Sequence, residues 1–144
     1  MLKGIDPLLH ADLLHALASM GHGDDLVIAD ANFPAASMAR RLVRLDGAGA
    51  PAALRAVLTL LPLDDFVEHP AAVMAVVGDP ARVPEPVRDF QPVLAAAAGR
   101  PVTIERLERF AFYDRSRAAF AVVATGDARK YANIILRKGV IAVD

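Results

Sequence analysis

Short apolar runs separated by helix-length segments constrain the fold of this chain more than any other feature of its sequence. Runs of strand length begin at Asp25, Val73, Phe120 and Ala132. Apolar runs of this length, bounded by turn residues, are typical of strands that are buried on both faces. Segments with helical periodicity lie between the runs. This alternation predicts the α/β class, with a largely parallel sheet that is covered by helices.

The hydrophobic periodicity and the capping residues predict where these elements begin and end. Leucines on one helical face, with Gly21 as a stop, predict a first helix at about 8–20. Further helices are expected at 34–39, 52–61, 85–98 and 109–118. Pro92 should kink or shorten the helix that contains it. Strands are expected at 25–29, 41–45, 73–77, 102–107, 120–124 and 132–136.

The composition excludes several classes of function. The 144 residues suffice for one domain, over 1–144, with a core of its own. Without cysteine there can be no disulfide, thiolate nucleophile or thiolate metal site. A net charge of −1 offers no electrostatic basis for binding nucleic acid. No apolar run reaches the ~18–20 residues that span a bilayer, and the first residues lack the apolar core of a signal peptide, so we expect a cytoplasmic protein with no membrane partner.

The apolar content of the chain is high for its size. Hydrophobic residues make up 55% of the sequence, and the mean hydropathy is +0.36, whereas average domains are about 45–50% apolar. Fully buried strands and contacts between subunits would both raise this fraction. We therefore expect a homo-oligomer.

The segment from Met20 to Pro34 holds the strongest candidate for acid–base chemistry. His22 lies between two glycines, and Asp30 ends the first expected strand, at the edge where open α/β sheets bind ligands. Histidine titrates near neutral pH and suits proton transfer, but His22 could instead cap the first helix, and Asp30 could form an Asx turn. An extended strand would separate the two by about 15–20 Å. They can share one ligand only if the glycine loop folds back or if they come from two subunits.

Two further polar pairs could bind a ligand. Arg109 and Tyr113 lie four residues apart on one face of an expected helix, although an arginine–aromatic surface pair beside buried phenylalanines is the simpler interpretation. Tyr131 and Asn133 alternate along an expected strand, so that both side chains point to one face. They could bind sugar hydroxyls there, or form a polar cross-strand pair.

Other site chemistries find no support in the sequence. The four histidines do not have metal-ligand spacing, so we expect no metal site. The chain has neither a phosphate-binding glycine loop nor a serine in a nucleophile elbow. These absences argue against a nucleotide cofactor and against serine hydrolysis.

Several motifs, taken together, resemble a known family. Met20-Gly-His-Gly-Asp, Asp30-Ala-Asn-Phe-Pro, Arg109-Phe-Ala-Phe-Tyr and Tyr131-Ala-Asn-Ile-Ile-Leu occur in the order and spacing of the ribose pyranase and L-fucose mutarotase family (RbsD/FucU). The resemblance extends over 2–140 and is greater to the fucose branch. It implies a compact α/β domain with helices on both sides of the sheet. It also implies assembly into rings, often decamers, with sugar sites at subunit contacts.

The resemblance implies an activity as well. Members interconvert the cyclic forms of a monosaccharide, here the α and β anomers of L-fucose or a related sugar, which is an isomerase reaction without cofactor or metal. The catalytic residues that it implies are His22 and Tyr113. The residues that it implies for sugar binding are Asp30, Arg109, Tyr131 and Asn133.

The substrate and the class of function stay open at this point. Asn32 stands where fucose mutarotases commonly have histidine, so the preferred sugar could differ from L-fucose. A non-catalytic sugar-binding or transport accessory protein would use the same polar groups without proton transfer. Ribose pyranase activity, aldose–ketose isomerisation and a role in assembly alone are further alternatives.

Overall fold

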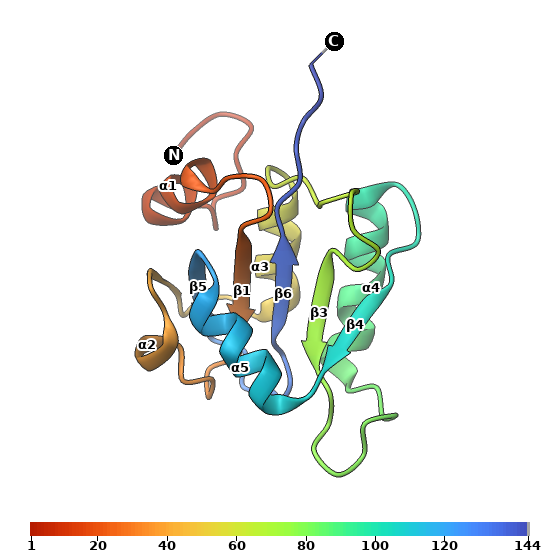
Figure 1. Cartoon of the computed structure of the whole chain (residues 1–144). Coiled ribbons are helices and arrows are strands. Elements are labelled where there is room, and N and C mark those ends of the chain that lie inside the picture. The colour runs from red at the N-terminus through yellow and green to blue at the C-terminus, as the bar shows by residue number, and fades with distance from the viewer. Residues whose placement is uncertain (144) are drawn as a thin grey trace.

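Six strands form one sheet at the centre of the structure (Figure 1). The structure is a computed structural model that describes residues 1–143. In chain order the strands are β1 (Asp25–Ala29), β2 (Leu42–Leu45), β3 (Ala71–Met74), β4 (Ile104–Leu107), β5 (Ala121–Thr125) and β6 (Ile134–Arg137). Their spatial order is β2-β5-β1-β6-β3-β4, and β6 runs antiparallel to both of its neighbours while the other pairs are parallel. The predicted α/β class with a largely parallel sheet is confirmed.

Helices cover both faces of this sheet. They are α1 (Ala11–Ser19), α2 (Ala35–Met38), α3 (Ala50–Leu58), α4 (Glu85–Ala98) and α5 (Arg109–Ala118). On one face, α1, α3 and α4 contribute core residues such as Leu13, Leu54 and Phe90. On the other face, α2 and α5 contribute Ala35 and Phe112.

The central strand β1 shows why its sequence is continuously apolar. Leu26 and Ile28 belong to the core under α1, α3 and α4, whereas Val27 and Ala29 belong to the core under α2 and α5. Successive side chains of a strand point to opposite faces, so a strand between two helical layers needs apolar residues at every position. All four of these residues are fully buried.

The first helix begins later than the leucine pattern predicts. Helix α1 starts at Ala11 rather than near residue 8, because His10 caps it. The Nδ1 atom of His10 accepts the backbone N–H of Leu13 at 3.3 Å, and its Nε2 lies 2.9 Å from the carbonyl oxygen of Arg44. Leu9 is nonetheless buried in the same core, which explains the extended apolar pattern.

Two other expectations need correction. Helix α4 continues through Pro92 to Ala98, so the proline does not shorten it; Phe90 and Leu94 pack fully into the core on either side. Strand β3 covers Ala71–Met74 rather than 73–77, because its pairing with β6 begins at Ala71. Within residues 1–143 no helix combines the length and apolarity needed to cross a membrane.

The strand directions give the sheet two edges that carry different segments. The carboxyl edge holds the ends of β1, β3 and β5 and, since β6 is antiparallel, the start of β6. The connection 126–133 from β5 to β6 therefore crosses the end of β1, where the N–H of Ala31 donates to the carbonyl of Asp127 at 2.8 Å. Gly126 opens this connection so close to the carbonyl oxygen of Asp46 that an added Cβ would lie 1.9 Å from it. The amino edge holds the segments that precede β1 and β3 and the segment that follows β6.

Candidate functional site

A pocket at the carboxyl edge is lined by five of the six predicted site residues. Its volume is about 230 Å³. Its walls come from the end of β1, the segment after β3, the start of α5 and the connection before β6. The predicted residues among its lining are Asp30, Arg109, Tyr113, Tyr131 and Asn133. Asn32, the residue that departs from the family pattern, lines it as well.

Asp30 is a buried carboxylate in the wall of this pocket. Its Oδ1 accepts the N–H of Asn32 at 2.9 Å, so the Asx turn considered from the sequence does form. Its backbone N–H donates to the side-chain oxygen of Asn133 at 2.7 Å. Burial raises the pKa of the Asp30 carboxyl, and the hydrogen bonds from Asn32 and Asn133 offset this only in part. Asp30 thus both forms the turn and lines the pocket.

Replacing Asp30 with Asn should raise the free energy of unfolding at pH 7. A carboxyl whose pKa is raised on folding costs stability above its unfolded pKa, here 3.8, and this cost disappears as the pH falls toward that value. The amide can still accept the N–H of Asn32 but carries no charge to bury. Urea unfolding of both proteins between pH 7 and pH 4 measures the difference. An advantage of the variant that does not shrink at low pH would contradict this explanation.

Tyr131 has a left-handed backbone, with φ of 63°, and within residues 1–143 it is the one non-glycine residue with a positive φ. Such a conformation costs about 1–3 kcal/mol and persists where surrounding contacts impose it, often at functional sites. The prediction of a strand over 132–136 is wrong at its start, because β6 begins at Ile134. The Tyr131 hydroxyl accepts the N–H of Val77 at 3.1 Å, which leaves the phenol proton for donation to a ligand.

Arg109 and Tyr113 reach the pocket from the amino-terminal half of α5. The carboxylate of Glu108 caps this helix by accepting two backbone N–H groups, and fully buried Phe112 fixes its rotation. The Arg109 guanidinium lies over the ring of Phe110, 4.7 Å from its centroid. The arginine–aromatic surface pair considered from the sequence therefore forms with Phe110. Phe110 is itself exposed, contrary to the expectation of buried phenylalanines.

His22 lies at the amino edge and does not line this pocket. It precedes β1, whereas Asp30 follows β1, so the glycine loop does not fold back to bring them together. The Nε2 atom of His22 lies 3.2 Å from Oδ1 of Asp64. The His22 side chain is 45% exposed while that of Asp64 is 3% exposed, so a buried carboxylate holds an accessible imidazole.

The structure does not support His22 as the cap of the first helix. Carbonyl oxygens at the end of α1, those of Leu17 and Met20, accept hydrogen bonds from the ammonium group of Lys138. A cation at a helix carboxyl terminus is favourable because the unpaired carbonyls carry partial negative charge. Lys138, rather than His22, therefore caps the carboxyl end of α1.

Asp64 is the candidate functional residue that the sequence pattern does not reveal. Its Oδ1 also accepts the N–H of Phe66 at 3.0 Å. The chain brings it to His22 by pairing with the segment after β6, where the N–H of Asp64 donates to the carbonyl of Arg137 at 3.0 Å. Because a carboxylate only accepts hydrogen bonds, this contact assigns the proton to Nε2 of His22 and leaves Nδ1 as the proton acceptor.

An apolar pocket of about 590 Å³ adjoins His22. Leucines from α1 and from the segment just after α3 line it, together with the segment 138–141. Phe66, whose ring centroid is 5.3 Å from that of His22, and Ile141 are each 72% exposed. Contiguous exposed apolar patches, rather than single exposed side chains, mark interaction surfaces. No group of three or more His, Asp or Glu side chains within 1–143 is arranged to hold a metal ion.

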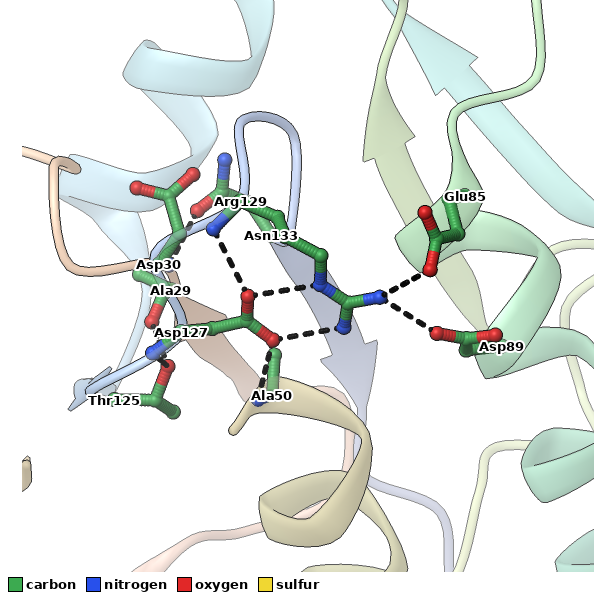
Figure 2. Close-up of polar contacts among 9 residues, drawn as sticks. All are labelled: Ala29, Asp30, Ala50, Glu85, Asp89, Thr125, Asp127, Arg129 and Asn133. Atoms are coloured by element: carbon green, nitrogen blue, oxygen red, sulfur yellow. Dashed lines mark hydrogen bonds and ion pairs between the residues drawn. The ribbon is translucent and has the colours of Figure 1, made fainter. Parts of the chain in front are cut away.

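An ion-pair network lies behind the carboxyl-edge pocket (Figure 2). The carboxylate of Asp127 accepts hydrogen bonds from Nε and Nη2 of Arg129, at 3.0 and 2.9 Å, and from the N–H of Ala50 at 3.0 Å. The Nη1 atom of Arg129 reaches Asp89 of α4 at 2.8 Å and Glu85 at 3.4 Å. The Arg129 guanidinium, with the Ala50 N–H, holds the pKa of Asp127 at about 2 against the effect of burial.

Replacing Asp127 with Asn should cost about 2 kcal/mol of the free energy of unfolding at pH 7. A carboxyl whose pKa falls on folding stabilises the protein above its unfolded pKa of 3.8 and loses that effect as the pH falls toward 2. Urea unfolding at pH 7, 5 and 3, at one protein concentration, tests this. The deficit of the variant should be equal at pH 7 and 5 and smaller at pH 3, and a deficit independent of pH would rule out the ionic explanation.

The fold and the pocket define a class of protein. A buried carboxylate, an amide, two phenols and a guanidinium converge outside the carboxyl ends of the strands, where α/β proteins bind small ligands. The class is that of an α/β protein with a small, polar-lined pocket at the carboxyl edge of its sheet.

Comparison with known proteins gives the family. The sequence profile of the RbsD / FucU transport protein family matches residues 3–141, and the fucose mutarotase of Homo sapiens is 50% identical over 148 aligned residues, which cover 99% of this chain and 96% of that protein. The crystal structure of the fucose mutarotase in complex with L-fucose from Streptococcus pneumoniae has a TM-score of 0.91 and 43% identity, over 98% of this chain and 100% of that one. Bacillus subtilis RbsD complexed with D-ribose has a TM-score of 0.74 and 25% identity, over 99% and 100%. This chain belongs to the RbsD/FucU family.

Proposed function

We propose that this protein is a mutarotase that interconverts the α and β anomers of L-fucose, an isomerase reaction. The observation that carries the proposal is the convergence of five polar side chains in one pocket of a chain whose relatives are fucose mutarotases. The relative with L-fucose bound is also more similar in structure than the relative with D-ribose bound.

The proposed active site is completed by a second subunit. Strand β1 separates His22 from Asp30 by about 17 Å, at 3.3 Å per residue, so one protomer does not bring them to the same sugar. The two halves of the proposed site are His22 at the amino edge and the pocket at the carboxyl edge. An exposed apolar side chain lies beside each: Phe66 beside His22, and Phe110 beside the carboxyl-edge pocket. We propose that His22 of the partner subunit faces this pocket, with its apolar surroundings forming the contact.

A contact between two different edges of neighbouring protomers is heterologous, and such contacts close into a ring when the rotation between protomers divides a full turn. The decamer expected from the resemblance is one such ring, and analytical ultracentrifugation measures its size. The cytoplasmic location is part of the same proposal, and cell fractionation tests it.

Proton transfer is the chemistry that we assign to His22. Its Nδ1 removes the proton of the anomeric hydroxyl while an acid donates a proton to the ring oxygen, and the bond from C1 to the ring oxygen breaks to give the open-chain aldehyde. Rotation about C1–C2 presents the other face of the carbonyl. Ring closure then returns both protons to their donors, so no atom or electron is gained or lost. Tyr113 is our proposed acid, because its phenol lines the pocket from α5.

Sugar binding is the role that we assign to the other four side chains. The Asp30 carboxylate accepts hydrogen bonds from sugar hydroxyls, Arg109 donates to sugar oxygens, and Asn133 can do either. The Tyr131 hydroxyl donates its proton, since its oxygen already accepts from the backbone. Asn32 shares this pocket, so it is the residue most able to alter the choice of sugar.

Saturation-transfer NMR tests the proposal with L-fucose, D-ribose, L-rhamnose and D-galactose. We expect the protein to accelerate anomer exchange of L-fucose most. Faster exchange between the pyranose and furanose forms of D-ribose would assign it to the ribose activity instead. Binding of L-fucose without any acceleration would overturn the enzyme proposal in favour of a non-catalytic sugar-binding protein.

A further inference from the structure

We propose that Arg129 is a positioning residue of the site: by bridging Asp127 and Asp89 it fixes the β5–β6 connection, so that Tyr131 keeps its left-handed backbone and presents its hydroxyl to the ligand. The consequence for catalysis rests on the proposed function. The consequence for Tyr131 itself does not.

The connection 126–133 is anchored at both ends on the central strand. At its start, the Thr125 hydroxyl donates to the carbonyl of Ala29 at 2.7 Å and accepts the N–H of Asp127 at 3.2 Å. At its end, Asn133 accepts the N–H of Asp30. Figure 2 shows these two anchors side by side, with the Arg129 side chain extending from the connection toward α4. Arg129 therefore fastens the middle of a segment whose ends are already fixed.

The geometry of this bridge requires a guanidinium. Two nitrogens of Arg129 bind both oxygens of Asp127 in a fork, while the third reaches Asp89 and, at longer range, Glu85. A planar cation with several fixed donors can bind one carboxylate bidentately and still reach another, which an ammonium group cannot. The Asp127 side chain is 5% exposed and that of Arg129 is 35% exposed, so the carboxylate end of the fork is buried while the guanidinium keeps partial contact with water.

Tyr131 follows Arg129 by two residues and has the conformation that most needs support. A side chain at positive φ is disfavoured for L-residues, so local sequence does not hold Tyr131 in place. Its phenol oxygen accepts the N–H of Val77, and its side chain packs against the core under α2 and α5. If the Arg129 bridge is lost, we expect the backbone to relax and the phenol to leave Val77.

The effect on the reaction should fall on sugar binding. Tyr131 is assigned to binding rather than to proton transfer, so misplacing it weakens affinity and leaves the acid–base groups intact. We expect Arg129→Met to raise the KM for L-fucose about tenfold or more, with kcat changed less than about threefold.

Tyrosine NMR provides a readout that needs no sugar. The chain has two tyrosines, so selective ¹³Cζ labelling gives two signals, which the Tyr113→Phe variant assigns. In Arg129→Met the Tyr131 signal should shift or broaden while the Tyr113 signal stays in place. The matched control is Arg44→Met, which breaks an exposed bidentate pair with Asp46. It should move neither signal and leave KM unchanged.

The outcomes separate the two proposals. An unchanged Tyr131 signal and an unchanged KM in Arg129→Met overturn the positioning role, as does an equal change in Arg44→Met. If the wild-type protein does not accelerate anomer exchange, the proposed function fails, yet the Tyr131 signal still decides the positioning role. Should Arg129→Met not fold, Asp89→Asn removes only the α4 end of the bridge, and the same shift of the Tyr131 signal is expected.

Discussion

The His22→Ala variant should accelerate L-fucose anomer exchange at least about 10²-fold less than the wild-type protein, with its fold intact. A correctly placed proton-transfer group contributes about 10²–10⁴-fold, and the variant removes the group outright. The fold should survive because the imidazole is half-exposed, and Asp64 keeps its hydrogen bond from the N–H of Phe66. Saturation-transfer NMR measures the exchange, and circular dichroism and ultracentrifugation verify the fold and the assembly.

A matched control for this variant is His15→Ala. His15 is an exposed histidine of α1 whose side chain lines neither of the two proposed halves of the site. It should exchange anomers at the wild-type rate. Wild-type exchange in His22→Ala would remove His22 from the mechanism and leave the carboxyl-edge pocket to be explained as a binding site.

Mixing two inactive variants should restore activity. In His22→Ala the pocket is intact, and in Asp30→Asn the histidine is intact, so a site formed between one subunit of each kind contains both groups. Random mixing of equal amounts regenerates about a quarter of the sites, because each site takes one half from each neighbour. Asp30→Asn alone should be inactive. Its amide presents an N–H donor to the ligand at a position where the carboxylate presents an acceptor.

Co-expression with two affinity tags gives the mixed oligomers, and mass spectrometry gives their composition. Each variant alone, carried through the same purification, sets the baseline. Verified mixed oligomers that stay at this baseline would mean that the two residues do not meet across a subunit contact, and the proposed composite site would be wrong.

Strand β1 was predictable because its burial shows directly in its sequence as an unbroken apolar run. Residues 26–29 lie between two helical layers, and full burial on both faces requires an apolar residue at each position. The start of α1 was not predictable from the leucines, because Leu9 is buried in the same core without being helical. Pro92 did not break α4, because packing of Phe90 and Leu94 outweighs a local preference.

Site residues that belong to a local sequence motif were predictable. Site residues that are brought in only by contacts between distant parts of the chain were not. Asp30 and Arg109 fall at the ends of predicted elements, and open sheets gather such ends at one edge. Asp64 is one of two adjacent acids in a loop, and only a contact across 42 residues joins it to His22. The backbone of Tyr131 was mispredicted, because period-two spacing implies a strand and carries no information about a left-handed turn.

The reversed direction of β6 has a consequence for the assembled protein. Its four residues, Ile134–Arg137, join Asn133 at one edge of the sheet to Lys138, beside the His22 pocket, at the other. In the proposed ring, Asn133 and Lys138 of one protomer belong to two different active sites. Each β6 therefore connects two neighbouring sites. A slip of its pairing by one residue would turn every side chain to the opposite face. Such an error in one protomer would disable two sites at once.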